Sequence, residues 1–414
     1  MFSTPLKSCR LCDGDDLREV LALTPTPAGD HYLPSERHPE KLPVFPLSLF
    51  QCATCGHVQL GGVVDPAYLY REYIYTTDSS LGLAEHFRDY AQKTVEKLSL
   101  KPGALVVELG SNDGTLLRAF QSLGMRVAGV DPARDIARRA TESGIPTISE
   151  FFTSGVAAQI LAKEGPADLV IANNVMANVS SPGEVVSAVR QILAPHGVFV
   201  FETGYLRYLA EDCVFDNIYH EHIDYYALRP LVRFFSSLGM ELFDVHVSES
   251  KGSSIRCYVS LNAEKRPVAS IIPQLIAREK ECRYQEPEPY AALAGKLQET
   301  KFQLLRILDR ERLAGRAAAG FGASVGVTTV LYHFDLGSRI SYLVDDNPTR
   351  QGLFSPGLGL PVSSPDVLCS DHRPDLVLIL AWRYAAQIMA KHVRYSHEGG
   401  RILQMLPEVS TRVR

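Results

Sequence analysis

Residues 104–115 read ALVVELGSNDGT, an apolar run of strand length followed by a cluster of turn-forming residues. Apolar residues at 116, 117, 120 and 123 then recur with the spacing of one helix face. Strand, glycine turn and helix in this order predict the opening unit of a nucleotide-binding α/β domain. Gly110 and Gly114 would let the backbone approach a ligand closely, because glycine has no Cβ. A second strand is predicted at 127–130, and Asp131 follows it, where a carboxylate usually holds ribose hydroxyls.

The residues around this turn favour a cofactor other than a dinucleotide. The third glycine of the pyrophosphate-binding fingerprint is missing, and Glu108 precedes the turn. A carboxylate there would repel a pyrophosphate and attract an ammonium group, which favours a nucleoside with a cationic amino-acid tail and no phosphate. The pattern of Glu108, two glycines and a later acid resembles the first two motifs of class I S-adenosylmethionine (SAM) methyltransferases. The alternative is an ordinary turn that binds no ligand.

The chain has 414 residues, enough for two or three domains with cores of their own. Its net charge of −5 and its balance of charged and apolar residues are typical of a soluble globular protein. No basic run stands out, so we expect no nucleic-acid partner. The N-terminus lacks the apolar segment of a signal peptide, and no run reaches transmembrane length. We therefore expect a cytoplasmic protein without a membrane partner.

Four of the eight cysteines form two Cys-x-x-Cys pairs, Cys9 with Cys12 and Cys52 with Cys55. Each pair can direct two thiolates at one point, and two pairs complete the tetrahedral sulfur site of a structural zinc ion. Redox-active dithiols and unlinked thiols are the alternatives. His31 and His57 lie nearby and are not needed as ligands. The many prolines between positions 25 and 46 predict few regular elements, so that the metal would supply stability.

Tyrosines at 68, 70, 73 and 75 precede a run of hydroxyl side chains, and a helix is predicted at 81–98. Tyrosines clustered beside hydroxyls are common at ligand sites, where they provide flat walls with a hydrogen-bonding tip. The alternative is core packing, with a helix N-cap at Ser79 or Ser80.

The α/β pattern continues, with strands predicted at 167–172 and 197–201, helices at 133–143, 155–163 and 182–193, and a final hairpin of strands at 242–247 and 255–260. This alternation predicts a doubly wound, mostly parallel sheet. Asn173 follows one of the strands and should lie on the same rim as the glycine turn, where such sheets bind ligands.

Tyr219, His220, Glu221 and His222 are four polar residues in a row. Such a density is rare outside a functional site, and histidine is the side chain best suited to take a proton near neutral pH. A neighbouring carboxylate could orient the histidine and raise its basicity. A zinc site built on the two histidines and a polar loop without chemistry are the alternatives.

The C-terminal third predicts another, smaller α/β unit. A charged helical stretch at 278–312, interrupted near Pro287 and Pro289, would lead into it. The expected elements are a strand at 316–321, a turn with Gly320 and Gly322, a helix to about 332, and strands at 340–344, 375–381 and 401–406. The turn could hold a phosphate on the backbone N–H groups of a helix N-terminus, or it could be a packing turn.

In this order the motifs resemble those of the sugar C-methyltransferase family, whose members add a methyl group to carbon 3 of nucleotide-linked 4-keto deoxysugars. The resemblance covers nearly the whole chain and rests on the four cysteines, the tyrosine-rich stretch and motifs at 108–114, 219–222, 252–256, 320–323 and 356–361. It implies a zinc-binding domain at 1–67, a class I SAM methyltransferase domain at 68–265 and a Rossmann-like substrate-binding domain at 266–414.

The resemblance also implies a mechanism and a set of site residues. A base would remove the proton next to the ketone of a keto sugar nucleotide, and the resulting enolate would take the methyl group of SAM. His222 would be the base, and Tyr219 and Glu221 would orient it or stabilise the enolate. The cofactor would be lined by Glu108, Gly110, Asn112, Gly114, Asp131 and Asn173, and covered by Tyr75 and Ser79.

Three positions depart from the family pattern. Asn178 stands where members usually carry a histidine, residues 322–328 lack the usual lysine, and Gly359 replaces a histidine in a later loop. Asparagine cannot titrate, and the other two positions lie where the phosphates of a nucleotide sugar would be bound. The acceptor could therefore differ in its nucleotide or its sugar, or carry no nucleotide.

Three other functions stand as alternatives: methylation of oxygen or nitrogen by the same architecture, a zinc-stabilised protein that binds SAM without turnover, and an NAD-dependent oxidoreductase. The run at 219–222 favours methylation of carbon, because a base beside an acid suits removal of a proton next to a ketone. Intact Glu108, Asp131 and His222 argue against a protein without turnover. Glu108 and the missing third glycine argue against NAD.

Overall fold

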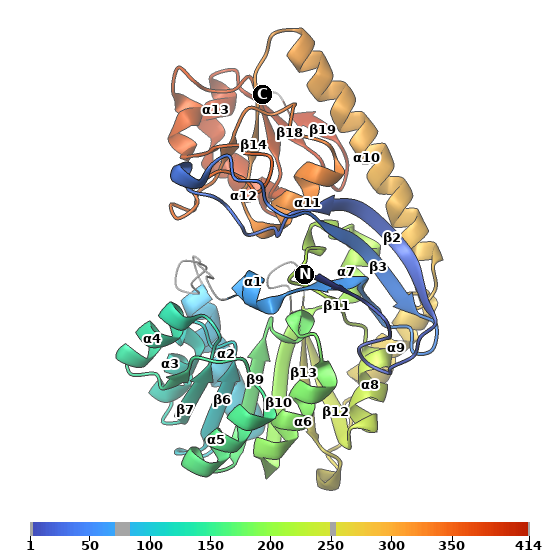
Figure 1. The fold of residues 1–414 in the computed structure, drawn as a ribbon, viewed down its shortest axis with the longest axis vertical. Coiled ribbons are helices and arrows are strands. Elements are labelled where there is room, and N and C mark those ends of the chain that lie inside the picture. The colour runs from blue at the N-terminus through green and yellow to red at the C-terminus, as the bar shows by residue number, and fades with distance from the viewer. Residues whose placement is uncertain (1–2, 71–82, 249–253, 413–414) are drawn as a thin grey trace.

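The computed structural model describes residues 3–70, 83–248 and 254–412, and three large sheets organise them (Figure 1). A seven-stranded sheet lies at the bottom of the view and a six-stranded sheet at the top. A four-stranded sheet, formed mainly by the N-terminal segment, lies beside the gap between them. The long helix α10 (Glu288–Leu313) runs along one side of the molecule, from the lower sheet to the upper one.

The seven-stranded sheet is doubly wound, which confirms the predicted fold class. Its strands are β6 (Leu105–Leu109), β7 (Arg126–Val130), β8 (Thr147–Ile148), β9 (Ala167–Asn173), β10 (Leu193–Gly204), β12 (Met240–Ser248) and β13 (Ser254–Leu261). They lie in the order β12-β13-β10-β9-β6-β7-β8, and only the final hairpin of β12 and β13 is antiparallel to its neighbours. The chain turns back between β6 and β9, and ligands of such sheets bind at this switch point.

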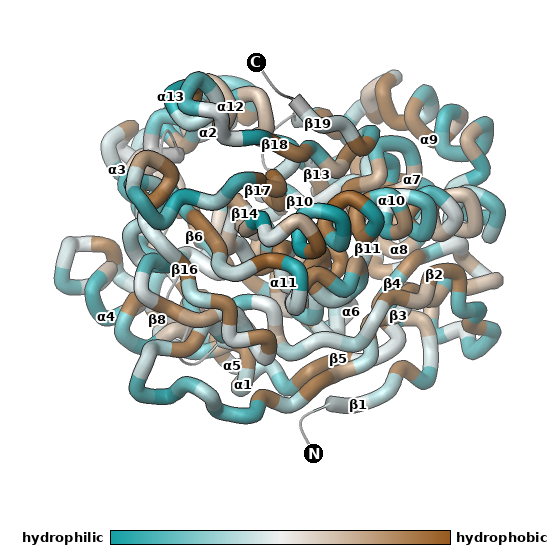
Figure 2. The backbone as a smooth tube through the Cα atoms, turned by 90° about the horizontal axis from the view of Figure 1, so that it is seen from above, coloured by the Kyte–Doolittle hydropathy of each residue, from teal (hydrophilic) through white to brown (hydrophobic). Residues whose placement is uncertain are grey.

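Helices bury both faces of this sheet, because successive strand residues point to opposite sides. Val106 faces a cluster with Tyr90 and Phe120 from α2 and α3, whereas Leu105 and Val107 face the other side. The helices are α2 (Leu83–Leu98), α3 (Thr115–Ser122), α4 (Arg134–Glu142), α5 (Ser154–Glu164), α6 (Pro182–Ile192) and α8 (Leu228–Ser237). Figure 2 shows the resulting pattern, with hydrophobic stretches on interior strands such as β6 and hydrophilic ones on the outer helix α4.

The N-terminal region is more regular than its prolines predicted, so that prediction was wrong. Strands β2 (Leu17–Thr26), β3 (Phe45–Cys52) and β4 (Val58–Leu60) form an antiparallel sheet, which β11 (Asp224–Tyr225) completes. Pro46 lies opposite the register shift between the Leu23 and Thr26 pairs, where the missing N–H interrupts no regular ladder. Leu47 and Leu49 alternate inward and are fully buried. Beside this sheet lie β1 (Ser3–Pro5), β5 (Gly62–Val64) and the short helix α1 (Pro66–Tyr70).

The upper sheet has the order β16-β15-β14-β17-β18-β19 and is parallel except for its last strand. Its elements are β14 (Ala318–Phe321), α11 (Val325–His333), β15 (Leu343–Val344), β16 (Val362–Ser363), β17 (Leu376–Ile379), α12 (Ala385–Lys391), α13 (Val393–His397), β18 (Arg401–Gln404) and β19 (Ser410–Arg412). The connection to the lower sheet passes through α9 (Ile271–Glu281) and α10, interrupted where prolines were predicted to break it. In the described part of the chain, no helix combines the length and the apolar character needed to cross a membrane.

Candidate active site

The glycine turn after β6 has the backbone that its sequence predicts. Gly110 and Gly114 have φ angles of 66° and 76°, in the left-handed region that glycine adopts most easily. A Cβ at Gly110 would lie 2.5 Å from the Val175 side chain, so a larger residue would not fit. Asp131 braces the turn, since its Oδ2 accepts a hydrogen bond from the Asn112 backbone N–H at 2.8 Å. The end of β7 and the turn are thus held together as one unit.

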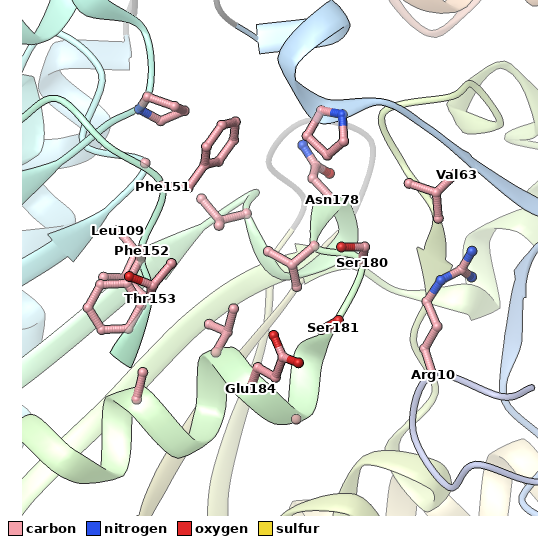
Figure 3. Close-up of a pocket in the computed structure, with 18 of the residues that line it drawn as sticks. Arg10, Val63, Leu109, Phe151, Phe152, Thr153, Asn178, Ser180, Ser181 and Glu184 are labelled. Atoms are coloured by element: carbon pink, nitrogen blue, oxygen red, sulfur yellow. The ribbon is translucent and has the colours of Figure 1, made fainter. Parts of the chain in front are cut away.

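A cavity of about 1410 Å³ opens at this turn (Figure 3). Five predicted cofactor residues line it: Glu108, Gly110, Asn112, Asp131 and Asn173. Gly114 is not among the lining residues, and it instead precedes the first turn of α3. Tyr75 and Ser79, the predicted cover of the cofactor, lie outside the described residues. The structure therefore brings together five of the eight predicted cofactor residues around one space.

The polar groups on the cavity wall fit a cofactor with a cationic tail. Glu108 is 4% exposed, and its Oε2 has no hydrogen-bond partner among the described residues. Burial, helped by Asp113 and Asp131, raises the pKa of Glu108 well above its usual range. A buried carboxyl without a partner is costly, and an ammonium group from a ligand would relieve that cost. The amide Nδ2 of Asn173 also lacks a partner among the described residues.

The loop after β8 adds cavity residues that the sequence reading missed. Phe151, Phe152 and Thr153 line one side of the cavity, and Arg10 and Val63 lie across from them (Figure 3). This loop leaves the carboxyl end of a parallel strand, on the rim where ligands bind. β8 has only two residues, too few for its periodicity to be recognised. The adjacent pair of phenylalanines before a predicted helix was the signal that could have revealed the loop.

His222 and Tyr219 form a hydrogen-bonded pair in the turn before β11. His222 Nδ1 lies 3.1 Å from the backbone oxygen of Asn217, and His222 Nε2 lies 2.8 Å from the Tyr219 hydroxyl. A carbonyl oxygen can only accept, so Nδ1 carries the proton and Nε2 of the neutral ring is the basic nitrogen. Burial raises the pKa of Tyr219 well above its usual range, so the phenol stays protonated and donates to Nε2.

The other two residues of the run have different environments. Burial lowers the pKa of His220 to about 4, and its Nε2 bonds the backbone oxygen of Pro46 at 3.3 Å. A histidine that stays neutral and packed in this way has a structural role. Burial, together with the charge of Asp30, raises the pKa of Glu221 to about 8, although Arg350 opposes the shift. Glu221 therefore carries a proton at neutral pH and can donate a hydrogen bond.

The pair of His222 and Tyr219 does not line the large cavity. His222 instead borders a separate space of about 30 Å³, together with Asn217 and Asp224. Tyr70 connects the two regions, because it lines the large cavity and its hydroxyl lies 3.5 Å from the backbone oxygen of Glu221. Asn178 also lines the large cavity, beside the Tyr70 hydroxyl.

The four predicted zinc ligands converge on one point. All four sulfur atoms lie within 4.8 Å of one another, and the Cys9–Cys55 and Cys12–Cys52 pairs are each 3.6 Å apart. Sulfurs about 2.3 Å from a tetrahedral zinc ion would be about 3.8 Å apart, so the geometry fits. The hydrogen bond from Cys55 lowers the pKa of the Cys9 thiol to about 4. In the described part of the chain this is the only side-chain group suited to a metal, which leaves the alternative zinc site at residues 219–222 without support.

The comparisons with known proteins cover the same three regions. Family models match a "Putative zinc binding domain" at residues 9–70, a "Methyltransferase domain" at 83–245 and a "C-methyltransferase C-terminal domain" at 249–407. C-methyltransferase NovU of Streptomyces niveus is 32% identical over 405 residues, which cover 98% of this chain and 96% of that protein. The chain belongs to the C-methyltransferase family. It is a SAM-dependent enzyme with a zinc-binding domain, and the predicted family, enzyme class and cofactors are confirmed.

Other relatives match a smaller share of this C-methyltransferase. A ubiquinone biosynthesis O-methyltransferase of Burkholderia pseudomallei (strain 1710b) is 27% identical over 162 residues, 35% of this chain and 67% of that protein. Among solved structures, a SAM-dependent methyltransferase from Clostridium acetobutylicum covers 43% of this chain and 92% of its own, with 13% identity and a TM-score of 0.35.

The second glycine turn of this C-methyltransferase is a packing contact. Asp345 braces it as Asp131 braces the first, with its Oδ2 accepting from the Ala323 N–H at 2.6 Å. The first turn of α11, however, lies against other segments of the chain. A Cβ at Gly326 would strike the backbone oxygen of Asp216, and one at Gly29 would lie 2.6 Å from the backbone oxygen of Val325. Of the two readings of this turn, the structure favours packing over phosphate binding.

Proposed function

We propose that this enzyme methylates a carbon next to the ketone of a deoxysugar, most simply a nucleotide-linked 4-keto sugar, with His222 as the base. The observation that carries the proposal is the pairing of His222 Nε2 with the Tyr219 hydroxyl while Nδ1 donates to a backbone oxygen. A neutral imidazole held through Nδ1, whose Nε2 accepts a hydrogen bond from a phenol, has a basic nitrogen that suits the removal of a weakly acidic C–H proton. The full-length relative NovU, a C-methyltransferase by name, supports carbon as the atom that is methylated.

The cofactor would lie in the large cavity, on the rim of the seven-stranded sheet. Asp131, which lines this cavity, would accept hydrogen bonds from ribose hydroxyls. Glu108 and Asn173 would meet the amino-acid tail, since each has a buried polar atom without a partner among the described residues. Phe151 and Phe152 offer aromatic faces for the adenine ring. When bound there, SAM supplies an electrophilic methyl group.

His222 would perform the proton transfer on the acceptor. Nε2 would take the proton from the carbon beside the ketone once the Tyr219 hydroxyl turns away from it, and the electron pair of the broken C–H bond would move into the enolate. Before the reaction the Tyr219 hydroxyl holds the ring in place through Nε2. Burial raises the pKa of Tyr219, so the phenol would keep its proton and donate it in a hydrogen bond to the enolate oxygen. Glu221 is protonated near neutral pH and can donate to the developing enolate oxygen. Tyr75 and Ser79 remain the proposed cover of the cofactor.

Each part of the chain would have one task under this proposal. Residues 1–67 form the zinc-binding domain, residues 68–265 bind SAM and carry the base, and residues 266–414 form a Rossmann-like domain that binds the acceptor. Gly359, which replaces a family histidine, packs against the ring of His38, which in turn stacks on Phe354 at 4.3 Å. Near Gly359, the acceptor would therefore be bound by other residues than those of the family motif. For this reason the test must include sugars with and without a nucleotide.

The test is methylation of a panel of keto and non-keto sugars, with and without a nucleotide, followed by mass spectrometry in H₂O and D₂O. Wild-type enzyme should methylate a keto sugar and exchange its neighbouring C–H for deuterium. His222→Gln should lose both reactions while its affinity for S-adenosylhomocysteine stays within about twofold. His196→Gln is the matched control, because it makes the same substitution at an exposed histidine that pairs with Glu264 and not with the residues of the site. Methylation at oxygen or nitrogen, or an active His222→Gln variant, would refute the proposal.

A further inference from the structure

The strand that follows the catalytic run belongs to the sheet of the zinc-binding region. β11 pairs antiparallel with β4, so that Asp224 lies opposite Gln59 and Tyr225 opposite Val58. The Leu60 N–H also donates to the backbone oxygen of Ile223 at 2.8 Å. Cys52 is the last residue of β3 and β4 begins at Val58, so the second Cys-x-x-Cys pair spans the end of β3 and the turn that leads to β4. The chain leaving His222 is therefore an edge strand of the sheet that presents half of the zinc ligands.

One side chain within the first cysteine pair and one just after the second contact the same carboxylate on this strand. His57 Nε2 lies 2.8 Å from Asp224 Oδ1, and both side chains are 0% exposed. Arg10 Nη1 lies 3.6 Å from the same oxygen and is 4% exposed. Arg10 lies between Cys9 and Cys12, and His57 follows Cys55 by two positions. The segments of both pairs thus each contribute one side chain to a buried carboxylate two residues after His222.

Arg10 also holds the backbone on both sides of this contact. Its Nη1 donates to the backbone oxygen of Ile223 at 3.1 Å, and its Nη2 donates to the backbone oxygen of Leu60 at 3.1 Å. The Arg10 backbone N–H donates to the Gln59 side chain at 3.0 Å. One side chain from the first cysteine pair therefore fixes the residue next to His222 and the strand that pairs with it.

The opposite end of the turn has an anchor of its own. Arg383, from the C-terminal unit, lies 3.2 Å from Asp216 Oδ2 and 3.3 Å from Asn217 Oδ1. Asn217 presents the backbone oxygen that receives His222 Nδ1–H. The turn is thus clamped at two points, and release of one clamp leaves the other in place.

We infer that Asp224 is a positioning residue, through which the zinc site fixes the turn that carries His222. The inference rests on the proposed function in taking His222 as the base. A buried carboxylate needs its partners, so the position of Asp224 depends on Arg10 and His57. Those two side chains are held by the backbone of the cysteine pairs, which zinc ligation closes. A zinc ion held by the four cysteines would therefore also hold the turn that carries His222, in addition to stabilising the N-terminal region.

The experiment is hydrogen–deuterium exchange mass spectrometry on the full-length, zinc-loaded protein, which requires no acceptor. Asp224→Ala should speed exchange in peptides covering residues 214–227 by about tenfold or more, with residues 105–122 unchanged. Bound zinc and affinity for S-adenosylhomocysteine should stay within about twofold. Glu311→Ala is the matched control: it removes another buried carboxylate held by two arginines, Arg316 and Arg401, in the C-terminal unit. This control should leave the turn unchanged.

Two further variants keep the test decisive if Asp224→Ala folds poorly. Arg10→Met keeps the length of the side chain and removes its hydrogen bonds, and it should loosen the same peptides. Asp224→Asn restores an acceptor for His57 and should give intermediate exchange. Once an acceptor is known, Asp224→Ala should lower kcat by about 10- to 100-fold while KM for SAM stays unchanged. Exchange in residues 214–227 that matches wild type in Asp224→Ala or Arg10→Met would overturn the inference.

The proposed function can fail independently of this inference. If Asp224→Ala loosens the turn as expected but His222→Gln keeps full activity, Asp224 does position the turn, but the catalytic base is another residue. If His222→Gln is inactive but the turn is as rigid in Asp224→Ala as in wild type, the base stands and the zinc site does not position it.

Discussion

Replacing Glu221 with glutamine should remove a pH dependence of stability that this one carboxyl creates. Burial and the charge of Asp30 raise the pKa of Glu221 from 4.5 to about 8 in the folded protein. In the unfolded chain the group ionises near its ordinary value. The folded state therefore holds a proton that the unfolded state releases at every pH between these values. The stabilisation that this proton gives is complete below about pH 4.5 and is lost as the pH rises through 8.

The size of the effect follows from the two pKa values. Within this window the free energy of unfolding falls by about 1.4 kcal/mol per pH unit. From pH 6 to pH 7.5 the loss is about 2 kcal/mol, because the folded group begins to ionise as the pH approaches 8. With an unfolding entropy of about 2.1 cal/mol/K per residue, this loss lowers Tm by about 2 °C if all 414 residues unfold together. A smaller cooperative unit gives a larger shift.

The assay is differential scanning calorimetry of wild type and Glu221→Gln at pH 6 and pH 7.5. Glutamine is neutral at both values, so Tm of the variant should fall by about 2 °C less than that of wild type over this interval. Glu311→Gln is the control, because Arg401 and Arg316 lower the pKa of Glu311 to about 2 and it stays ionised throughout. An infrared band of a protonated carboxyl at pH 6, missing in Glu221→Gln, would give direct support. Equal pH dependence in wild type and Glu221→Gln would refute the reasoning.

Three further outcomes are expected. Cys9→Ser removes one zinc ligand, so metal analysis should find little bound zinc and Tm should fall; an equally stable, zinc-free variant would contradict the structural zinc site. Asp131→Ala should weaken S-adenosylhomocysteine binding about tenfold or more in calorimetry, because the glycine turn loses its brace, and unchanged binding would exclude Asp131 from the cofactor site. Gly110→Ala should cost about 1–3 kcal/mol more than Gly103→Ala, since both have positive φ but only the first meets Val175; equal losses would show that the contact is relieved.

The sequence predicted the methyltransferase sheet well because its signals are local. The strands of the switch point, β6 and β9, are apolar runs whose neighbours in the chain suffice to identify them. β8 and β11 have two residues each, and they form only because they pair with neighbouring strands. Such short strands have no recognisable hydrophobic periodicity in the sequence. The N-terminal sheet was missed because the number of prolines was taken as evidence against strands. Whether a proline interrupts a strand depends on its position in the strand pairing, and residues far apart in the chain decide that pairing.

The chemistry of single residues was partly readable and partly not. Glu108 and Asp131 followed from their spacing around the glycine turn, and the structure places both on one cavity. His220 and His222 are equivalent in a sequence pattern. Only their surroundings separate them, because His220 is buried against Pro46 while His222 meets a phenol. The raised pKa of Glu221 arises from burial and, secondly, from the charge of Asp30, almost two hundred residues away in the chain, and no local pattern contains either cause.

The sequence by itself determined the cofactor class, the zinc ligands and the order of the three regions, because each depends on residues close together in the chain or on two short repeated spacings. Only the tertiary structure decided which residues of these regions contact one another. Asp224 meets Arg10 and His57 across more than 160 residues, and the pairing of β11 with β4 makes the strand after His222 part of the N-terminal sheet. A buried carboxylate finds its partners wherever the fold brings them, so this link exists only in the folded chain.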